Sequence, residues 1–305
     1  MREAIGVSKG LLLIGSIVGL LVGLALGTLI LGPLIAGPKP TRETCVIMGS
    51  TTVLPIIEEC ARVFMKNNPW ADIRVSGGGS GVGIANLIDG VCDIAMASRK
   101  PKPEEIDAAN ATGVNMVLHV IALDAVCVIV HPSVEEALGE PLKLTLEELR
   151  KIFIGEWTMW SQVNPKLPDK PIIVFIREPG SGTRGTFEDF VLKEGDVCVG
   201  HEKHGNPALR DAVKNTPWSI GYVGLGFVEE PDVRAVHIYN DEIGEYVEPS
   251  KDAVRKGIYP LVRKLYLITN GRPPEGSLVA RFIDFVLSPK GQSIVEDKGF
   301  IAIAR

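Results

Sequence analysis

Three times along this chain, a short run typical of a β-strand ends in glycine and polar residues, and a segment typical of a helix follows. The three runs cover residues 45–48, 71–75 and 171–176. The order of strand, glycine-rich turn and helix is typical of α/β folds, in which helices cover the faces of a mostly parallel sheet. We therefore expect an α/β architecture with its polar junctions at the carboxyl ends of the strands, where open α/β sheets bind ligands.

The junction after the third run offers many hydrogen-bond donors. It reads Arg177-Glu178-Pro179-Gly180-Ser181-Gly182-Thr183-Arg184-Gly185. Glycines let the backbone turn its N–H groups inward, and the first N–H groups of the helix that follows have no internal partner. Together with two hydroxyls and an arginine, these groups favour a bound oxyanion. The alternative is an ordinary strand-to-helix turn that carries surface charge.

The other junctions carry the same kinds of group. Gly49-Ser50-Thr51-Thr52 precedes a helix that we expect over residues 53–66, and the loop 76–83 precedes one over residues 84–89. A further strand, residues 93–99, ends in a serine and an arginine. Several distant strand ends therefore present donors, and hardly any presents a carboxylate or a histidine.

Known nucleotide and hydrolase motifs are missing from these loops. Loop 76–83 lacks both the Lys-Ser/Thr ending of an NTPase phosphate loop and the spacing of a dinucleotide fingerprint. Neither Ser80 nor Ser181 lies in a G-x-S-x-G elbow. An enzyme acting on phosphoesters through the same donors is the alternative, but the five histidines flank none of the glycine loops. The pattern favours binding without catalysis.

The charge of the chain argues against nucleic acid as a partner. The formal net charge is −5, whereas a protein that wraps nucleic acid needs a dense basic face. Any anion site in this chain must therefore depend on local donors.

The five cysteines show no zinc-type spacing. Cys127 lies in an apolar run, and we expect it to be a buried thiol. A bridge between Cys60 and Cys92 stays open at this point. Cys198, together with the nearby histidines at positions 201 and 204, reads as scattered polar residues rather than a metal site. We expect neither a metal nor another cofactor.

The N-terminal residues 11–36 carry no charge. A helix over residues 11–32 would be roughly 33 Å long, enough for a bilayer core of about 30 Å. Cleavable signal sequences have shorter apolar regions, ~7–15 residues. We therefore expect residues 1–36 to be a retained transmembrane anchor with its short basic end in the cytoplasm. Residues 37–43 are then a proline-containing linker.

The apolar run 117–130 is too long for one ordinary strand. We interpret it as two strand segments that cross between two lobes near Asp124, with a return crossing at residues 220–224. The predicted lobes are residues 44–124 with 223–305, and residues 125–222. Two lobes joined by two crossings form a hinge around a cleft.

The junctions, taken in this order, resemble those of the phosphate-binding, substrate-binding proteins of phosphate ABC transporters. The resemblance covers about residues 44–305, and the motifs that carry it are residues 49–52, 77–81, 93–99, 177–185 and 282–291. It implies a two-lobed type II periplasmic-binding-protein fold with a central mixed sheet in each lobe. It also implies an extracytoplasmic protein that closes over inorganic phosphate and delivers it to a membrane permease.

The resemblance implies a set of phosphate-binding residues as well. The set is Ser50, Thr51, Thr52, Ser80, Ser98, Arg99, Arg177, Ser181, Gly182 and Thr183. Thr51 and Ser80 would donate through hydroxyl and backbone groups, and Thr52 through its backbone N–H. Arg177 would form a charged, fork-like contact, while the last three residues would contribute from the other lobe.

Two positions depart from the family pattern. Ser98 stands where several members have an aspartate that accepts the proton of phosphate, and Pro179 stands where another carboxylate often accompanies the arginine. A buried donor or acceptor left unpaired costs about 1–3 kcal/mol, so the missing acceptor bears on selectivity. A receptor for another tetrahedral oxyanion, such as sulfate, tungstate or molybdate, is the alternative.

Overall fold

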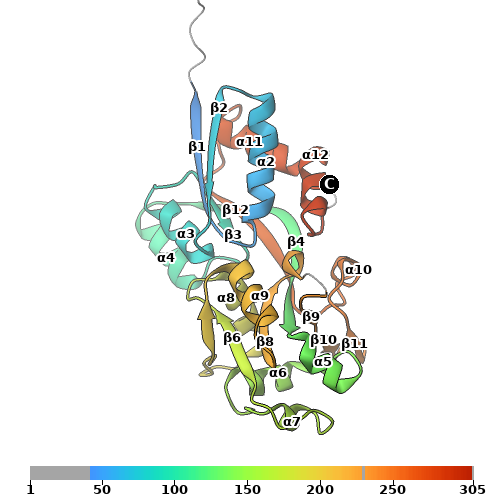
Figure 1. Ribbon diagram of the computed structural model, residues 1–305. Helices are drawn as coiled ribbons and strands as arrows, with labels where there is room; N and C mark the ends of the chain where they lie inside the picture. The colour runs from blue at the N-terminus through green and yellow to red at the C-terminus, as the bar shows by residue number, and fades with distance from the viewer. Residues whose placement is uncertain (1–41, 229–230, 304–305) are drawn as a thin grey trace, which may run out of the picture. The chain divides into compact units, whose positions relative to one another are not determined.

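In the computed structural model, which describes residues 42–228 and 231–303, the long strand β4 (Met116–Val130) joins two sets of strands (Figure 1). Residues 116–125 pair antiparallel with β12 (Val262–Asn270), and residues 126–130 pair antiparallel with β8 (Ser219–Gly224). The prediction of two strand segments is therefore wrong, because the chain continues through Asp124 as one strand of 15 residues. Its pairing partner nevertheless changes beside Asp124.

The strands form one mixed sheet in the order β2-β1-β3-β12-β4-β8-β6-β7, with β9 paired to β4. β1, β2 and β3 are parallel to one another, as are β6, β7 and β8, and β12 is antiparallel to both of its neighbours. The predicted α/β architecture is confirmed, although β4 joins the two expected sheets into one path. The bounds are β1 (Glu43–Gly49), β2 (Ala71–Ser76), β3 (Ile94–Ala97), β6 (Ile173–Arg177), β7 (His201–Lys203) and β9 (Arg234–Ala235).

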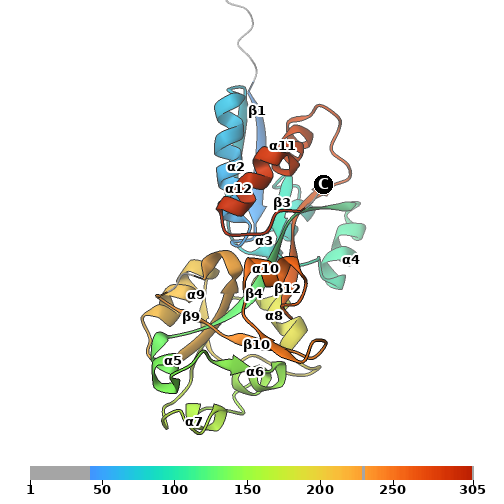
Figure 2. The same ribbon diagram turned by 90° about the vertical axis from the view of Figure 1, so that its right-hand side faces the viewer.

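The strands around β1 carry a hydrophobic cluster on each face. Because successive side chains of a strand point to opposite faces, Cys45 and Ile47 pack on one side and Val46 and Met48 on the other. Helices α2 (Leu54–Asn67), α11 (Leu278–Leu287) and α12 (Pro289–Asp297) cover the first face, and α3 (Ser80–Ile88) covers the second (Figure 2). We call residues 43–124 and 262–303 the first half.

The strands around β8 carry the other clusters. Helices α6 (Leu146–Phe153) and α8 (Gly182–Val191) contribute to the larger one, and α9 (Gly205–Lys214) packs on the opposite face. We call residues 125–228 and 231–261 the second half. Trp160 is fully buried there, and Trp157 and Trp218 pack against the same cluster.

We predicted that the chain returns to the first half at residue 223, but the segment after β8 packs with the second half. Val236, Ile238 and Tyr259 belong to the large cluster of the second half, and β10 (His237–Asn240) pairs with β5 (Lys143–Leu144) in a small separate sheet completed by β11 (Glu245–Val247). The hydrophobic packing places the return at β12 instead. The remaining elements are α4 (Pro103–Ala111), α5 (Pro132–Leu138), α7 (Trp160–Val163), α10 (Lys251–Arg255) and the 3-10 turn η1 (Leu225–Phe227).

Two helices begin earlier than predicted. α3 begins at Ser80 rather than at residue 84, and α8 begins at Gly182 rather than at residue 186. Glycine is a poor helix former, so the sequence placed these residues in loops. In the first turn of a helix the low helix propensity of glycine matters less, because the N–H groups there have no partner within the helix and must be reached by other groups. As a result, several of the predicted donors lie in first turns of helices.

The expected anchor, residues 1–36, lies outside the described residues. Among those that are described, no helix is both long and apolar enough to cross a bilayer.

All five cysteines are free and buried. The open alternative of a Cys60–Cys92 bridge is wrong, because Cys60 belongs to the cluster on one face of the sheet and Cys92 to the cluster on the other. Cys127 is a buried thiol, as predicted. Burial raises the thiol pKa values, to about 12 for Cys198 and about 11 for Cys92.

These thiols should therefore be unreactive in the folded protein. An aromatic disulfide reagent, which thiolates attack to release an aromatic thiolate, should react slowly at about pH 8. After denaturation the same reagent should count all five thiols. Fast reaction of any native thiol, or a count below five in the denatured chain without reductant, would contradict this expectation.

Candidate functional site

Helix N-termini from both halves meet beside β4 and β12. The Gly81 N–H of α3 donates to the Gly180 carbonyl at 2.9 Å, and the Thr52 and Thr183 hydroxyl oxygens lie 3.1 Å apart. Asn206, in the first turn of α9, donates from Nδ2 to the Thr52 hydroxyl at 2.8 Å. The positive ends of α3, α8 and α9, and the turn that leads into α2, therefore gather at one place.

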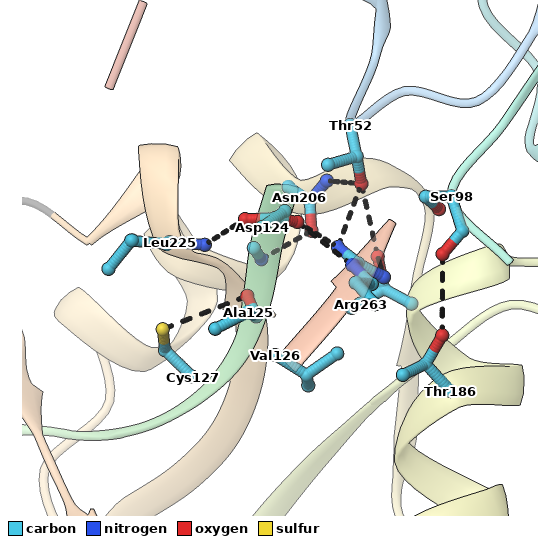
Figure 3. A network of polar contacts seen from close by, with 12 residues as sticks. Thr52, Ser98, Asp124, Ala125, Val126, Cys127, Thr186, Asn206, Leu225 and Arg263 are labelled. Carbon is cyan, nitrogen blue, oxygen red and sulfur yellow. Dashed lines mark hydrogen bonds and ion pairs between the residues drawn. The ribbon is translucent and has the colours of Figure 1, made fainter. Parts of the chain in front are cut away.

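The two halves lie close together at Gly182. A Cβ at this position would overlap with the hydroxyl oxygens of Ser80 and Ser98. Those two oxygens lie 3.4 Å apart, and the Ser98 N–H donates to Ser80 Oγ at 3.1 Å. The Thr186 hydroxyl also donates to the Ser98 carbonyl at 3.3 Å (Figure 3). Only glycine fits between these serines, which explains its place in the motif.

Arg177 lies at the centre of the junction with only 1% of its surface exposed. Its Nε and Nη2 each donate to the Glu178 carboxylate at 2.8 Å, and Nη1 donates to Asn206 Oδ1 at 2.9 Å. Nη2 also donates to the Thr51 hydroxyl at 3.2 Å, across the halves. These bonds use four of the five N–H hydrogens of the guanidinium. The fork that was expected to face an anion faces Glu178 instead.

Glu178 supplies the carboxylate that the family pattern led us to expect at Pro179. It is 6% exposed, and its Oε2 also accepts the Gly205 N–H at 3.2 Å. Burial on its own would raise the pKa of this carboxyl, but the hydrogen bonds and charge of Arg177 outweigh it, so the pKa lies below its usual value of 4.5. Sequence reasoning missed Glu178 and Asn206, although the acidic residue adjoins the arginine.

A second arginine enters the site from β12. Arg263 donates from Nε and Nη2 to Asp124 Oδ2 at 2.8 and 2.7 Å (Figure 3). Its Nη1 donates to the Thr183 hydroxyl at 3.1 Å. Asp124 Oδ1 accepts the Leu225 N–H at 3.0 Å. This pair was not predicted from the sequence. Its signal was a single aspartate inside the apolar run of β4, whereas β12 carries Arg263 beside Lys264.

Two predicted serines accept backbone N–H groups where helices begin. The Ser50 hydroxyl accepts the N–H groups of Thr52 and Val53 at 3.2 and 3.4 Å, so the Thr52 N–H that was expected to bind an anion is already bonded. The Ser181 hydroxyl accepts the Arg184 N–H at 3.3 Å and caps α8. Both serines lie at the site and shape its loops.

Arg99 lies at the edge of the site rather than at its centre. Its Nη1 and Nη2 each donate to Glu105 at 2.7 Å, and within the described residues its buried Nε has no hydrogen-bond partner. Together with Lys102, Ser181, Arg184 and others, it lines a cavity of about 220 Å³. No hydrogen bond joins it to the other predicted residues in the described part of the chain.

The charges at this site are balanced in pairs. Arg177, Arg263 and Arg99 each contact a carboxylate, and each carboxylate also accepts a backbone N–H. The hydroxyls, the first-turn N–H groups and the N–H hydrogens of the guanidinium groups that no carboxylate binds are what remains to contact a ligand. Such an arrangement offers donors to an anion, with its charge met by dipoles rather than by a free cation.

The Glu178–Arg177 pair should make stability depend on pH. A carboxyl whose pKa is lowered on folding stabilises the protein above its unfolded pKa, and this contribution is lost as the pH falls through the folded pKa. For Glu178 that loss lies below pH 4.5. Glu178→Gln should reduce the free energy of unfolding by about 3 kcal/mol near neutral pH, and the difference from wild type should shrink in acid. Urea unfolding of both proteins at several pH values measures it, and a difference that does not change with pH would contradict it.

Comparison with known proteins gives relatives of one kind. A PBP superfamily domain matches residues 35–290. The phosphate-binding protein PstS of Staphylococcus saprophyticus is 34% identical over 261 residues, which is 84% of this chain and 79% of that protein. The protein of the same name from Borreliella burgdorferi is 32% identical over 268 residues, 84% of this chain and 89% of that one.

Solved structures agree with this result. A phosphate ABC transporter substrate-binding protein from Clostridium perfringens, solved with bound phosphate, matches with a TM-score of 0.73 and 30% identity, over 86% of this chain and 100% of that one. An ABC-type phosphate transport receptor from Vibrio cholerae matches with a TM-score of 0.67 and 26% identity, over 85% and 100% of the two chains. The chain belongs to the PstS phosphate-binding protein family of the PBP superfamily.

Proposed function

We propose that this chain is the extracytoplasmic substrate-binding component of a phosphate ABC importer, which binds inorganic phosphate between its two halves and delivers it to membrane permease subunits. The observation that carries the proposal is the meeting of hydroxyls and helix N-termini from both halves around Arg177. Because the nearby carboxylates are already hydrogen-bonded, the site presents donors to its ligand. The relatives are phosphate-binding proteins by name, and the Clostridium perfringens structure holds phosphate. The function is binding and transport rather than catalysis.

The proposed phosphate contacts come from both halves. From the first half we assign Thr51 and Ser80, with Ser98 behind them. From the second half we assign Arg177 and the residues 181–183 at the start of α8, whose first-turn N–H groups have no partner within the helix. The Arg177 hydrogen that now reaches Thr51 is the one best placed to contact a phosphate oxygen. Ser50, Thr52 and Arg99, which completed the predicted set, act mainly on the neighbouring loops and side chains.

The two halves are the proposed lobes of the binding protein. β4 crosses between them beside Asp124, and the chain returns where β12 begins; the loops that carry the donors lie on either side of this crossing. Opening about the two strands would separate Thr52 from Thr183 and Gly81 from Gly180, and so admit the ligand. The lobe boundary proposed here follows the hydrophobic clusters, with the return at residue 262.

The location of the protein is proposed in part from sequence alone. We propose that the uncharged segment 11–36 is retained as a single membrane anchor, which would keep the binding unit near its permease on the extracytoplasmic side. Detection of the intact N-terminus in the membrane fraction of cells, by mass spectrometry, tests this assignment.

Phosphate binding is tested by calorimetry on the full chain in mild detergent. Wild-type protein should bind phosphate with a Kd of about 1 μM or tighter. Arg177→Lys keeps the charge but loses the fork, and it should weaken binding by roughly tenfold to a hundredfold. The matched control is Arg150→Lys, since Arg150 forms a similar fork with Asp196 and lies outside the site. Folded wild-type protein that gives no heat with phosphate would refute the proposed function.

The second candidate ligand is another tetrahedral oxyanion. The observation in its favour is Ser98, a hydroxyl where a proton-accepting carboxylate would distinguish phosphate from fully ionised sulfate. Competition titrations with sulfate, tungstate and molybdate separate the candidates. Ser98→Asp should raise the preference for phosphate over sulfate by roughly tenfold to a hundredfold, the value of one buried acceptor. Ser98→Asn is the uncharged control, and an equal effect of both variants would show that the carboxylate charge is not responsible.

A further inference from the structure

Arg263 and Asp124 lie opposite each other on β12 and β4, the strands that connect the two halves. Arg263 is 6% exposed and Asp124 is fully buried. Asp124 needs only Nε and one Nη2 hydrogen of the guanidinium, and the Leu225 N–H completes its partners. The outer N–H groups of Arg263 are therefore free to act elsewhere, and they reach two hydroxyls (Figure 3).

The first of these hydroxyls belongs to Thr52, in the first half. Its oxygen accepts Asn206 Nδ2 at 2.8 Å and Arg263 Nη2 at 3.4 Å. The orientation of the Asn206 amide is fixed, because its Oδ1 accepts Arg177 Nη1 and the Gly224 N–H. With both lone pairs of the Thr52 oxygen occupied, its hydrogen has to be donated.

The second hydroxyl belongs to Thr183, in the second half. Its oxygen accepts Arg263 Nη1 at 3.1 Å and lies 3.1 Å from the Thr52 oxygen. If Thr52 donates to it, both of its lone pairs are occupied as well, and the Thr183 hydrogen faces outward. If Thr52 instead donates to a ligand, it is the Thr52 hydrogen that faces outward. In either case the hydroxyl pair presents a donor to the site.

We propose that Arg263 is a positioning residue that fixes the Thr52–Thr183 pair as a hydrogen-bond donor and holds the two halves together through it. The proposal rests on the proposed phosphate-binding function. Asp124 stays paired with Arg263 when the halves separate, because both belong to the first half, on neighbouring strands. The bond to Thr183 exists only when the second half is closed against the first. Arg263 thus links closure of the halves to the presentation of a hydrogen-bond donor by the hydroxyl pair.

The test uses a paired substitution that leaves no buried charge alone. Arg263→Gln with Asp124→Asn replaces both ions by neutral groups, which avoids the large penalty of breaking a buried pair. Arg150→Gln with Asp196→Asn is the control, since that pair also joins Nε and Nη2 of an arginine to an aspartate and touches no residue of the site. Arg263→Lys serves as the second variant if the paired one does not fold, because it keeps the charge but not the reach of the fork.

Hydrogen exchange of the Gly81 amide decides the proposal without any ligand. This amide donates across the halves to Gly180, so its exchange reports opening. We expect exchange on the order of tenfold faster in the Arg263 variant than in wild type or in the control. Equal rates in all three proteins would overturn the proposal. Because the measurement needs no phosphate, it stands even if wild-type protein fails to bind phosphate, a result that would refute only the proposed function.

Phosphate titration of the same proteins adds a second readout. If wild-type protein binds phosphate, the Arg263 variant should bind it tenfold to a hundredfold more weakly, with the control within about twofold of wild type. The loss should shrink in a Thr183→Val background, because the arginine would then have lost the group through which it acts. Losses that simply add would show that Arg263 acts independently of Thr183, against the proposal.

Discussion

The burial of two guanidinium groups is the constraint on which the site depends. An arginine can be buried only if its charge is paired and its N–H groups are hydrogen-bonded. Glu178 and Asp124 meet this need for Arg177 and Arg263, and each fork leaves some N–H groups over. Those groups reach hydroxyls and an amide from both halves, so the pairing of charges also determines which way the neutral groups point.

This arrangement explains how an acidic chain can bind an anion. The formal net charge is −5, and the cations at the site are neutralised by carboxylates. We therefore expect recognition to come from the first turns of helices and from oriented hydroxyls, whose partial charges act at short range in a buried place. A ligand with acceptor oxygens on all sides fits these donors, whereas a cation would find no free carboxylate among the described residues of the site.

Much of the fold could be predicted from local sequence patterns, while the hydrogen-bond partners of the site residues could not. Strand–glycine–helix junctions are local, so Thr51, Ser80 and Arg177 were found from the sequence, and the structure brings them together. The partners of those residues depend on contacts between segments about 30 to 150 positions apart, as with Asn206 and Thr52. The glycine-containing first turns of α3 and α8 were missed because helix propensity does not include the hydrogen bonds that their N–H groups can make to a neighbouring loop. The return of the chain was predicted too early, because β8 looks like any apolar strand until its partners are known.

The unbroken course of β4 limits how the molecule can move. A loop between the halves would allow them to tilt in many directions, but β4 and β12 are hydrogen-bonded to each other over most of their length. A two-stranded ribbon bends and twists readily while resisting shear and separation, since those displacements break its ladder. Motion between the halves is thereby restricted to a few directions. The loops of the two halves therefore reach the same relative positions each time the halves close.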